Sequence, residues 1–357
     1  MESSKTVESS LSLVFGGDIM AHEPNFRNKD FGRIWRDITP LVSSGDLSFA
    51  NIEAPVANSI DWNTYPQFNM HTEYVEEAIK AGFNVFSLAN NHTNDQYLEG
   101  IKETKKYFDS REGIWACGVK DKSEASLTYK IIHKNGWKVL FVAVTEILNR
   151  KDYSSYIDYY PSTEKKRSQL VRELKSLQES SKCDLFVLSI HTDEAEYVLK
   201  ITENHRSFYK KLIEECKVDI IWANHPHIVK PFEETAASTF YTQGLGQKER
   251  KAFIMYANGN TISAQRTNPQ FTAPETNRDY TGDGLIIKMK ATKKSDGSVI
   301  LSDYQPHLIT TYITPSWQFV IKMLDDDFIK TLDRAEIVNW AKYLTERKKI
   351  MEKVLNP

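Results

Sequence analysis

Short apolar runs alternate with stretches of helical periodicity over the first 230 residues of the chain. The apolar runs are bounded by glycine, proline or polar residues, which is the pattern of buried strands. The clearest of these predicted strands are residues 11–17, Phe83–Leu88, Leu185–Ile190 and Val218–Ala223. Apolar residues at helical spacing predict helices at Phe31–Val42, Tyr74–Ala81, Leu98–Phe108, Ser168–Ser180 and His205–Cys216. Strands that alternate with helices are typical of an α/β fold.

Other segments complete this pattern. Further strands are predicted at Leu47–Glu53, Ile114–Val119, Leu127–His133 and Lys138–Val144. Beyond residue 230 the chain becomes rich in predicted strands, at Thr239–Thr242, Phe253–Ala257, Gly284–Ala291 and Val299–Leu308, and the last 35 residues are predicted to be helical. The polar residues 56–72 and the tyrosine-rich residues 151–161 predict loops, and whether they form a lid stays open.

Four of the predicted strands end in residues of the kind that bind metals. Asp18, Asn91-His92, His191 and the sequence His225-Pro226-His227 follow the four apolar runs named first. Open α/β sheets usually place their ligands at the edge formed by the carboxyl ends of their strands. We therefore expect these side chains, together with Glu53, to form one site assembled from distant parts of the chain.

The residue types indicate which metals the site would take. The predicted ligands are Asp18, Glu53, Asn91, His191, His225 and His227. Two divalent ions held close together need a bridging carboxylate and a set of donors on each side. Imidazole suits zinc and iron, and carboxylate and amide oxygens add tolerance for manganese. One or two ions of Mn, Fe or Zn are therefore the predicted cofactor.

Two sequence details suggest roles within this site. In an extended segment His225 and His227 would project the same way, with Pro226 stiffening the chain between them. His92 would stand away from the metals as a general acid, and Asp95 is a candidate to orient it.

Each of these residues also has an ordinary structural interpretation. Asp18 follows two glycines and Asn91 follows another asparagine, and such residues are common in turns. His191 alone is as well explained by a buried, hydrogen-bonded histidine, and Glu53 by a capping group. His22 and His71 are left without a role, although their loops lie near the predicted site. The prediction of a site therefore depends on the joint occurrence of the set.

Composition narrows the possible partners. The net charge of −2 gives no argument for nucleic acid or for an anionic membrane surface. The three cysteines have spacings that match no zinc or redox motif. Residues 1–10 are polar and lack an apolar signal region. They suit a cytoplasmic protein, or a disordered tail that remains after a leader or anchor has been removed.

An ordered set of motifs resembles the CapA-type family of capsule (poly-γ-glutamate) synthesis proteins, which have a calcineurin-like metallophosphoesterase fold. The matching motifs are Gly17-Asp18, Asn51-Ile52-Glu53-Ala54-Pro55, Asn90-Asn91-His92 with Asp95 and Gly100, His191, His225-Pro226-His227 and Gly259-Asn260. The resemblance implies a four-layer α/β/β/α sandwich with a metal site at one edge of paired sheets. It also implies a location in the cell envelope, with the cytoplasm as the alternative, and an anionic envelope polymer or a phosphoester as substrate.

The chain departs from the general metallophosphoesterase pattern at several positions. The usual Asp-x-His is Asp18-Ile19-Met20, so one imidazole ligand is missing, and Glu53 represents the bridging aspartate. Thr192-Asp193 follows the strand-ending histidine where family members often carry Trp-Gly, and Thr261 replaces a phenylalanine. Because of these departures, a site that binds one metal ion instead of two stays an alternative.

The expected organisation is a polar tail at residues 1–10, a single domain at 11–313 and a helical extension at 314–357 packed on it. The expected function is that of a hydrolase in which a metal-activated water attacks a phosphoester, or an amide, of a cell-envelope polymer. One alternative is a non-catalytic protein that binds polymer and assists a membrane capsule-synthesis complex. A third interpretation is a cytosolic nucleotidase or phosphodiesterase whose tyrosines at residues 153–160 stack on a base.

Overall fold

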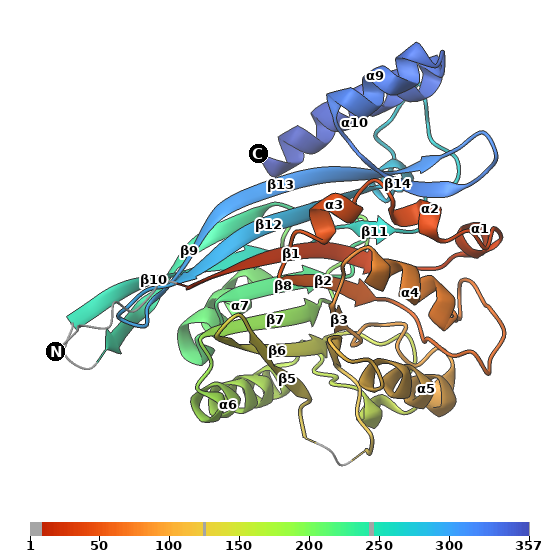
Figure 1. The fold of residues 1–357 in the computed structure, drawn as a ribbon. Coiled ribbons are helices and arrows are strands. Elements are labelled where there is room, and N and C mark those ends of the chain that lie inside the picture. The colour runs from red at the N-terminus through yellow and green to blue at the C-terminus, as the bar shows by residue number, and fades with distance from the viewer. Residues whose placement is uncertain (1–8, 124–125, 243–245, 357) are drawn as a thin grey trace.

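The computed structural model describes residues 9–123, 126–242 and 246–356 of the chain. Most of the predicted tail, residues 1–8, lies outside the described residues, whereas Ser9 and Ser10 begin the first strand. Two sheets stack face to face, and helices cover their outer sides (Figure 1). The predicted α/β class with two paired sheets is therefore confirmed.

The larger sheet has eight strands and is mixed. Its order is β14-β13-β12-β1-β2-β3-β4, and β11 pairs with β1. The strands are β1 (Ser9–Ile19), β2 (Leu47–Ile52), β3 (Val85–Ser87), β4 (Trp115–Cys117), β11 (Asn260–Ile262), β12 (Asp283–Lys293), β13 (Val299–Ile313) and β14 (Phe319–Met323). β1 to β4 are parallel, so their carboxyl ends meet at one edge.

The smaller sheet has six strands in the order β5-β6-β7-β8-β10-β9. They are β5 (Tyr129–Lys134), β6 (Trp137–Thr145), β7 (Leu185–His191), β8 (Ile220–Asn224), β9 (Phe232–Thr242) and β10 (Gly246–Met255). β6, β7, β8 and β10 are parallel to one another. This sheet therefore also brings several carboxyl ends to one edge.

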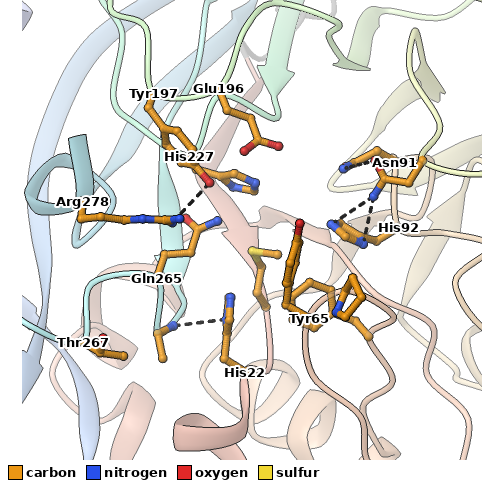
Figure 2. Close-up of a pocket in the computed structure, with 15 residues that line it drawn as sticks. His22, Tyr65, Asn91, His92, Glu196, Tyr197, His227, Gln265, Thr267 and Arg278 are labelled. Atoms are coloured by element: carbon orange, nitrogen blue, oxygen red, sulfur yellow. Dashed lines mark hydrogen bonds between the residues drawn. The ribbon is translucent and has the colours of Figure 1, made fainter.

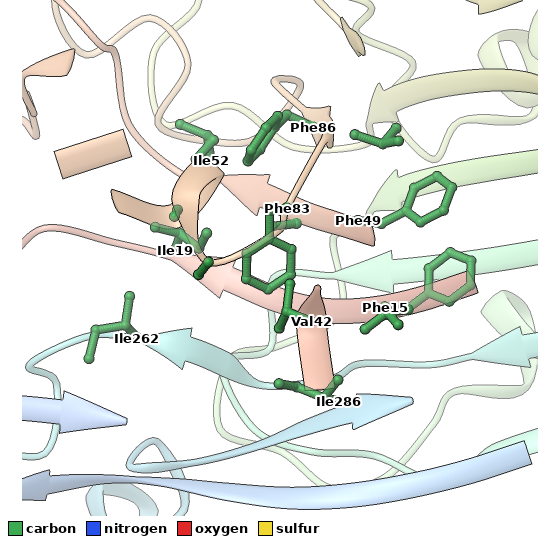
Figure 3. Close-up of a cluster of buried hydrophobic side chains, with 14 of the residues drawn as sticks. Phe15, Ile19, Val42, Phe49, Ile52, Phe83, Phe86, Ile262 and Ile286 are labelled. Atoms are coloured by element: carbon green, nitrogen blue, oxygen red, sulfur yellow. The ribbon is translucent and has the colours of Figure 1, made fainter. Parts of the chain in front are cut away.

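Successive side chains of β6 point alternately into two separate hydrophobic cores, one between the sheets and one beneath the helices. Val139 and Phe141 belong to the core between the two sheets, whereas Leu140 and Val142 belong to the core beneath α6 (Glu164–Ser181) and α7 (Glu203–Cys216). Successive residues of a strand point to opposite faces, so a strand that is buried on both sides is a continuous apolar run. Aromatic rings fill the space between the sheets: Phe15 of β1 stacks on Phe49 of β2 at 4.4 Å (Figure 3).

Helices α4 (Thr72–Lys80) and α5 (Tyr97–Asp109) follow β2 and β3 and agree with the predicted helices. The single helix predicted at Phe31–Val42 is wrong. The structure has two short helices there, α2 (Gly32–Trp35) and α3 (Thr39–Val42), after the short α1 (Glu23–Phe26). Pro40 lies in the first turn of α3, where its missing N–H is tolerated, whereas inside one long helix it would break the hydrogen-bond ladder.

The C-terminal residues pack on the outer side of the larger sheet (Figure 1). α9 (Asp326–Arg334) and α10 (Val338–Leu355) follow β14, which is an edge strand of that sheet. Arg347 of α10 is fully buried, and its Nε lies 2.7 Å from Asp283 Oδ2. The domain boundaries expected from the sequence stay predictions. Within the described part of the chain, the helices are too short or too polar to cross a membrane.

Candidate metal centre

The predicted ligands lie at the ends of five strands from both sheets. Asp18 is near the end of β1, Glu53 directly follows β2, and His191 is the last residue of β7. Asn91 follows β3, and His225 directly follows β8. The six residues, His227 included, are at most 3% exposed. The structure therefore brings the whole predicted set to one buried edge.

Glu53 is shared by two groups of potential ligands. Glu53, His225 and His227 form one group, and Asp18, Glu53 and His191 form the other, with the ligand atoms of each group within 4.8 Å of one another. Glu53 Oε1 lies 3.5 Å from His191 Nε2 and 3.6 Å from His227 Nε2. A carboxylate that belongs to both groups is in position to bridge two metal ions.

Two asparagines, Asn91 and Asn51, form hydrogen bonds with other predicted ligands. Asn91 Oδ1 lies 2.7 Å from His191 Nε2, so its amide contacts the site through this imidazole. Asn51 has no assigned role in the sequence analysis beyond its place in a family motif. Its Nδ2 donates to Asp18 Oδ1 at 2.8 Å and to Glu53 Oε2 at 3.3 Å. Asn51 therefore orients both carboxylates of the centre.

The electrostatics of the centre fit a divalent cation. Glu53 Oε1 and His225 Nδ1 are buried and have no hydrogen-bond partner within the described residues. Burial, and then the neighbouring carboxylate of Asp18, raises the pKa of Glu53 well above its usual range. Burial also lowers the pKa of His225 to about 3 and that of His191 well below normal. Buried neutral imidazoles, one of them with an unpartnered nitrogen, beside crowded carboxylates are a donor set that a metal ion satisfies.

The conformation expected for His225-Pro226-His227 is wrong, although the two imidazoles do converge. His225 has φ of 105° and His227 has φ of 57°, so the segment bends instead of running extended. Such values are strained for residues with a Cβ, by on the order of 1–3 kcal/mol each. Two hydrogen bonds stabilise the bend. The His225 N–H donates to Asp18 Oδ2 at 3.4 Å, and the Tyr197 N–H donates to the Pro226 carbonyl at 3.0 Å.

His92 lines the same pocket as Asn91 and His227, two of the predicted ligands. Its Nδ1 is 2.7 Å from Asp95 Oδ2, and the Phe68 N–H donates to the same oxygen at 2.8 Å. The ring of Phe68 meets the imidazole edge-on at 4.7 Å. Asn149 Nδ2 is 3.3 Å and 3.4 Å from the two ring nitrogens. Asp95 therefore fixes the orientation of His92, with Nδ1 facing the carboxylate.

A pocket of about 770 Å³ adjoins the centre and shares Asn91, His92 and His227 with it (Figure 2). Tyr65, Pro66 and Phe68 line it, so the predicted loop 56–72 borders the site. Residues 151–161 contribute no described lining residue. Tyr153 and Tyr156 instead contact each other, with ring centroids 6.5 Å apart. Met20, the position of the missing imidazole, lines the pocket and is buried.

Several lining residues were not assigned by sequence reasoning. They are His22, Glu196, Tyr197, Gln265 and Arg278. His22 is close behind Asp18 in the sequence, which is a usable signal, and burial followed by the charges of His227 and His92 lowers its pKa to about 3. Gln265 and Arg278 follow no predicted strand end, so nothing in the local pattern marks them. His71, in contrast, hydrogen-bonds the Ile60 carbonyl at 2.8 Å and is not among the lining residues.

A second cluster of the same residue types lies near the end of β7. Glu146, Asp193 and His205 offer ligand atoms within 4.8 Å of one another. Here a cation is already present, because Arg167 Nη2 lies 2.9 Å from Glu146 Oε1. His205 Nε2 lies 2.8 Å from Asp193 Oδ1 and 3.1 Å from Glu146 Oε2. Although burial opposes it, these hydrogen bonds raise the pKa of His205 to about 9.

Among solved structures, the chain is similar to the NAD nucleotidase NadN of Haemophilus influenzae, at 12% identity and a TM-score of 0.49. That match covers 96% of this chain and 61% of the other. It is also similar to the purple acid phosphatase PPD1 of yellow lupin, at 13% identity and a TM-score of 0.37, over 88% of this chain and 54% of the other. At these scores the likenesses carry no conclusion about this chain.

The sequence comparisons are more specific. The chain is 23% identical over 247 residues to a Bacillus subtilis (strain 168) protein named "PGA biosynthesis protein CapA", and the match covers 66% of this chain and 62% of that relative. The family model described as "Bacterial capsule synthesis protein PGA_cap" matches residues 12–265. The resemblance stated from the motifs is thereby confirmed, and the chain belongs to the bacterial capsule synthesis protein family PGA_cap.

Proposed function

We propose that this protein is a divalent-metal-dependent hydrolase that cleaves a phosphoester bond in a polymer of the cell envelope. The observation that carries the proposal is the buried Glu53 shared by two ligand groups, with one carboxylate oxygen left without a partner within the described residues. The adjoining pocket supports it, because a substrate there would contact both the centre and His92.

The ligands fall into two sets in this proposal. Asp18 and His191 would hold one ion and His225 and His227 the other, with Glu53 shared by the two sets. Asn91 completes the first set through its contact with His191. Mn, Fe or Zn held in this way would supply Lewis acidity at the scissile bond and activate a water for attack.

The chain itself supplies proton transfer and orientation. His92 lines the pocket beside the centre, so in its imidazolium form, with a proton on each ring nitrogen, its Nε2 is placed to give a proton to the leaving oxygen. Asp95 keeps Nδ1 protonated through the 2.7 Å hydrogen bond and so fixes which nitrogen faces the substrate. Asn51 holds Asp18 and Glu53 in place through its two hydrogen bonds.

Membership of the capsule synthesis family supports an envelope polymer as substrate, a location in the cell envelope and association with a membrane capsule-synthesis complex. The relative's name associates that protein with PGA biosynthesis, which makes a γ-glutamyl amide the second bond type to examine.

One observation favours a non-catalytic alternative. Met20 lines the pocket at the position where the general pattern has an imidazole, so the first ion has fewer nitrogen ligands. In this second candidate function, the cleft holds one structural ion and binds an anionic polymer without cleaving it.

Metal content tests the proposal first. We expect about two equivalents of metal in wild-type protein purified without chelator, and a loss of at least one in His225→Ala. His205→Ala is the matched control, because it removes a buried histidine from the neighbouring cluster and should leave metal content unchanged. One equivalent in the wild type would favour the binding protein, and none after reconstitution would contradict both candidates.

Turnover tests the chemical step. We expect His92→Asn to lower kcat on bis(p-nitrophenyl) phosphate by about 10²–10⁴-fold while the metal content stays at the wild-type level. Asp95→Asn should lower kcat less, because the imidazole remains in place with a weaker orientation. Wild-type turnover with full metal but no effect of His92→Asn would remove this residue from the mechanism.

A further inference from the structure

One wall of the pocket presents hydrogen-bond donors from three separate segments. His22 follows β1, Gln265 follows β11, and Arg278 belongs to the short helix α8 (Asn277–Tyr280). Figure 2 shows the three side chains directed into the space below His227. We call His22, Gln265 and Arg278 the donor wall.

The two neutral members have their acceptor atoms already occupied. His22 Nδ1 accepts a hydrogen bond from the Ala264 N–H at 3.3 Å, so the proton of the neutral ring is on Nε2. Gln265 Oε1 accepts from Asn260 Nδ2 at 2.9 Å, which leaves its NH₂ group unused. Among the described residues, neither Nε2 atom has a hydrogen-bond partner. Both side chains therefore have N–H groups available for a ligand in the pocket.

Arg278 adds the positive charge. It is the only lysine or arginine among the described lining residues, and no described carboxylate lies within ion-pair distance of it. Its guanidinium lies 5.0 Å from the ring centroid of Tyr197, and Nη1 is 3.4 Å from the Tyr197 hydroxyl. These contacts use one face and one edge of a group with five N–H donors, so the rest of the fork remains available.

The segment that carries Arg278 is anchored from behind. The adjacent Asp279 accepts hydrogen bonds from Thr276 Oγ1 at 2.6 Å and from the Tyr343 hydroxyl of α10 at 2.7 Å. Arg347 of α10 donates to the Pro274 carbonyl at 2.6 Å. Arg278 lies beyond residue 265, where the match to the family model ends. The cation of the pocket thus comes from a part of the chain outside the matched segment.

Resting on the hydrolase function proposed above, we propose that the donor wall binds a second oxyanion of the substrate, a carboxylate or a phosphate, next to the bond held at the metal centre. A wall with a guanidinium and available N–H groups matches such a group, because carboxylate and phosphate oxygens only accept hydrogen bonds. A polymer with an acidic group in each unit would then be held in register, one anion at the wall and the neighbouring linkage at the metals.

Three matched phosphonates test this inference by isothermal titration calorimetry on the manganese-loaded protein. Propylphosphonate carries one oxyanion, 3-phosphonopropionate adds a carboxylate, and propane-1,3-diphosphonate adds a second phosphonate. We expect Arg278→Ala to weaken the binding of a two-anion probe about tenfold more than that of propylphosphonate. The probe with the larger loss identifies whether the wall takes a carboxylate or a phosphate-like group.

Two further variants exclude a general effect on folding. Arg278→Lys keeps the charge without the planar fork and should show an intermediate loss, and Gln265→Ala should show a smaller one. Arg172→Ala, at an exposed position of α6, is the control arginine and should change none of the three affinities. Equal losses for all three probes, or no loss in Arg278→Ala, would overturn the inference.

Failure of this inference and failure of the hydrolase proposal are distinguishable. Arg278-dependent binding of a two-anion probe without any diester hydrolysis would retain the donor wall and remove the hydrolase. Metal-dependent hydrolysis, together with an equal effect of Arg278→Ala on all three probes, would retain the hydrolase and remove the donor wall.

Discussion

Two clusters of histidines and carboxylates lie near the end of β7, and they differ in whether an arginine balances their carboxylates. In the candidate metal centre, burial and then acidic neighbours, Asp18 first among them, raise the pKa of the Glu53 carboxyl. In the cluster of Glu146, Asp193 and His205, Arg167 already balances the carboxylates. The pKa values of the two histidines diverge for different reasons. Burial and the neighbouring His227 and His92 lower the pKa of His225 to about 3, whereas hydrogen bonds to Asp193 and Glu146 outweigh burial and raise that of His205 to about 9.

The comparison indicates that residue type alone does not distinguish a candidate metal site from a structural ion network. What distinguishes them is whether the protein supplies its own cation. The Glu146 cluster is complete, because its histidine is protonated and its carboxylates have partners. In the candidate metal centre, by contrast, Glu53 Oε1 has no hydrogen-bond partner among the described residues, and buried charge without compensation is strongly unfavourable.

The largest expected effects come from neutralising one carboxylate in each cluster, which tests whether the protein itself balances that charge. Glu146→Gln should lower the free energy of unfolding by about 3 kcal/mol, because it leaves Arg167 and the protonated His205 without their partner. Glu53→Gln should instead raise the free energy of unfolding of chelator-treated protein by about 1 kcal/mol, because it replaces a buried carboxyl whose charged form is disfavoured on folding, as its raised pKa indicates, by a neutral amide. Urea denaturation measures both, and changes of the same sign would contradict the distinction.

The pH dependence of stability tests whether His205 is protonated in the folded protein. The folded pKa of His205 is raised to about 9, above the ordinary value of 6.5. Its stabilisation is therefore fully present below pH 6.5 and is lost as the pH rises through 9. The difference in unfolding free energy between wild type and His205→Gln should shrink by about 2–3 kcal/mol between pH 6 and pH 10. A difference that does not depend on pH would mean that His205 is neutral in the folded protein.

The smallest expected effect concerns the helix that carries His205. Thr202 caps α7 and also contacts His205 Nδ1 at 2.7 Å, whereas Thr163 caps α6 without a histidine contact. Thr163→Ala should cost about 1 kcal/mol for the lost cap. Thr202→Ala should cost about 1 kcal/mol more, because it also removes the contact with His205. Thermal or urea unfolding of the two variants in parallel measures the difference between their losses of unfolding free energy. Equal losses would mean that the contact between Thr202 and His205 adds nothing to the helix cap.

Much of the fold was predictable because the relevant patterns are local. The apolar run Phe83–Leu88 contains β3, and the run Leu185–Ile190 covers β7 except for its last residue, His191. The strand ends indicated the edge at which the structure brings the predicted ligands together. The helix predicted at Phe31–Val42 failed because Pro40 acts on the hydrogen-bond ladder whatever the apolar spacing around it. His225-Pro226-His227 failed in backbone conformation, because the bend depends on contacts with Asp18 and Tyr197 from elsewhere in the chain.

The sequence by itself determined the α/β class, the family and the set of predicted metal ligands, since periodicity and ordered motifs are properties of neighbouring residues. Only the tertiary structure decided that Glu53 is shared by two ligand groups, that His205 belongs to a balanced ion network, and that Arg278 enters the pocket. Charge balance and burial depend on residues that are distant along the chain, and no local pattern records which of them will meet.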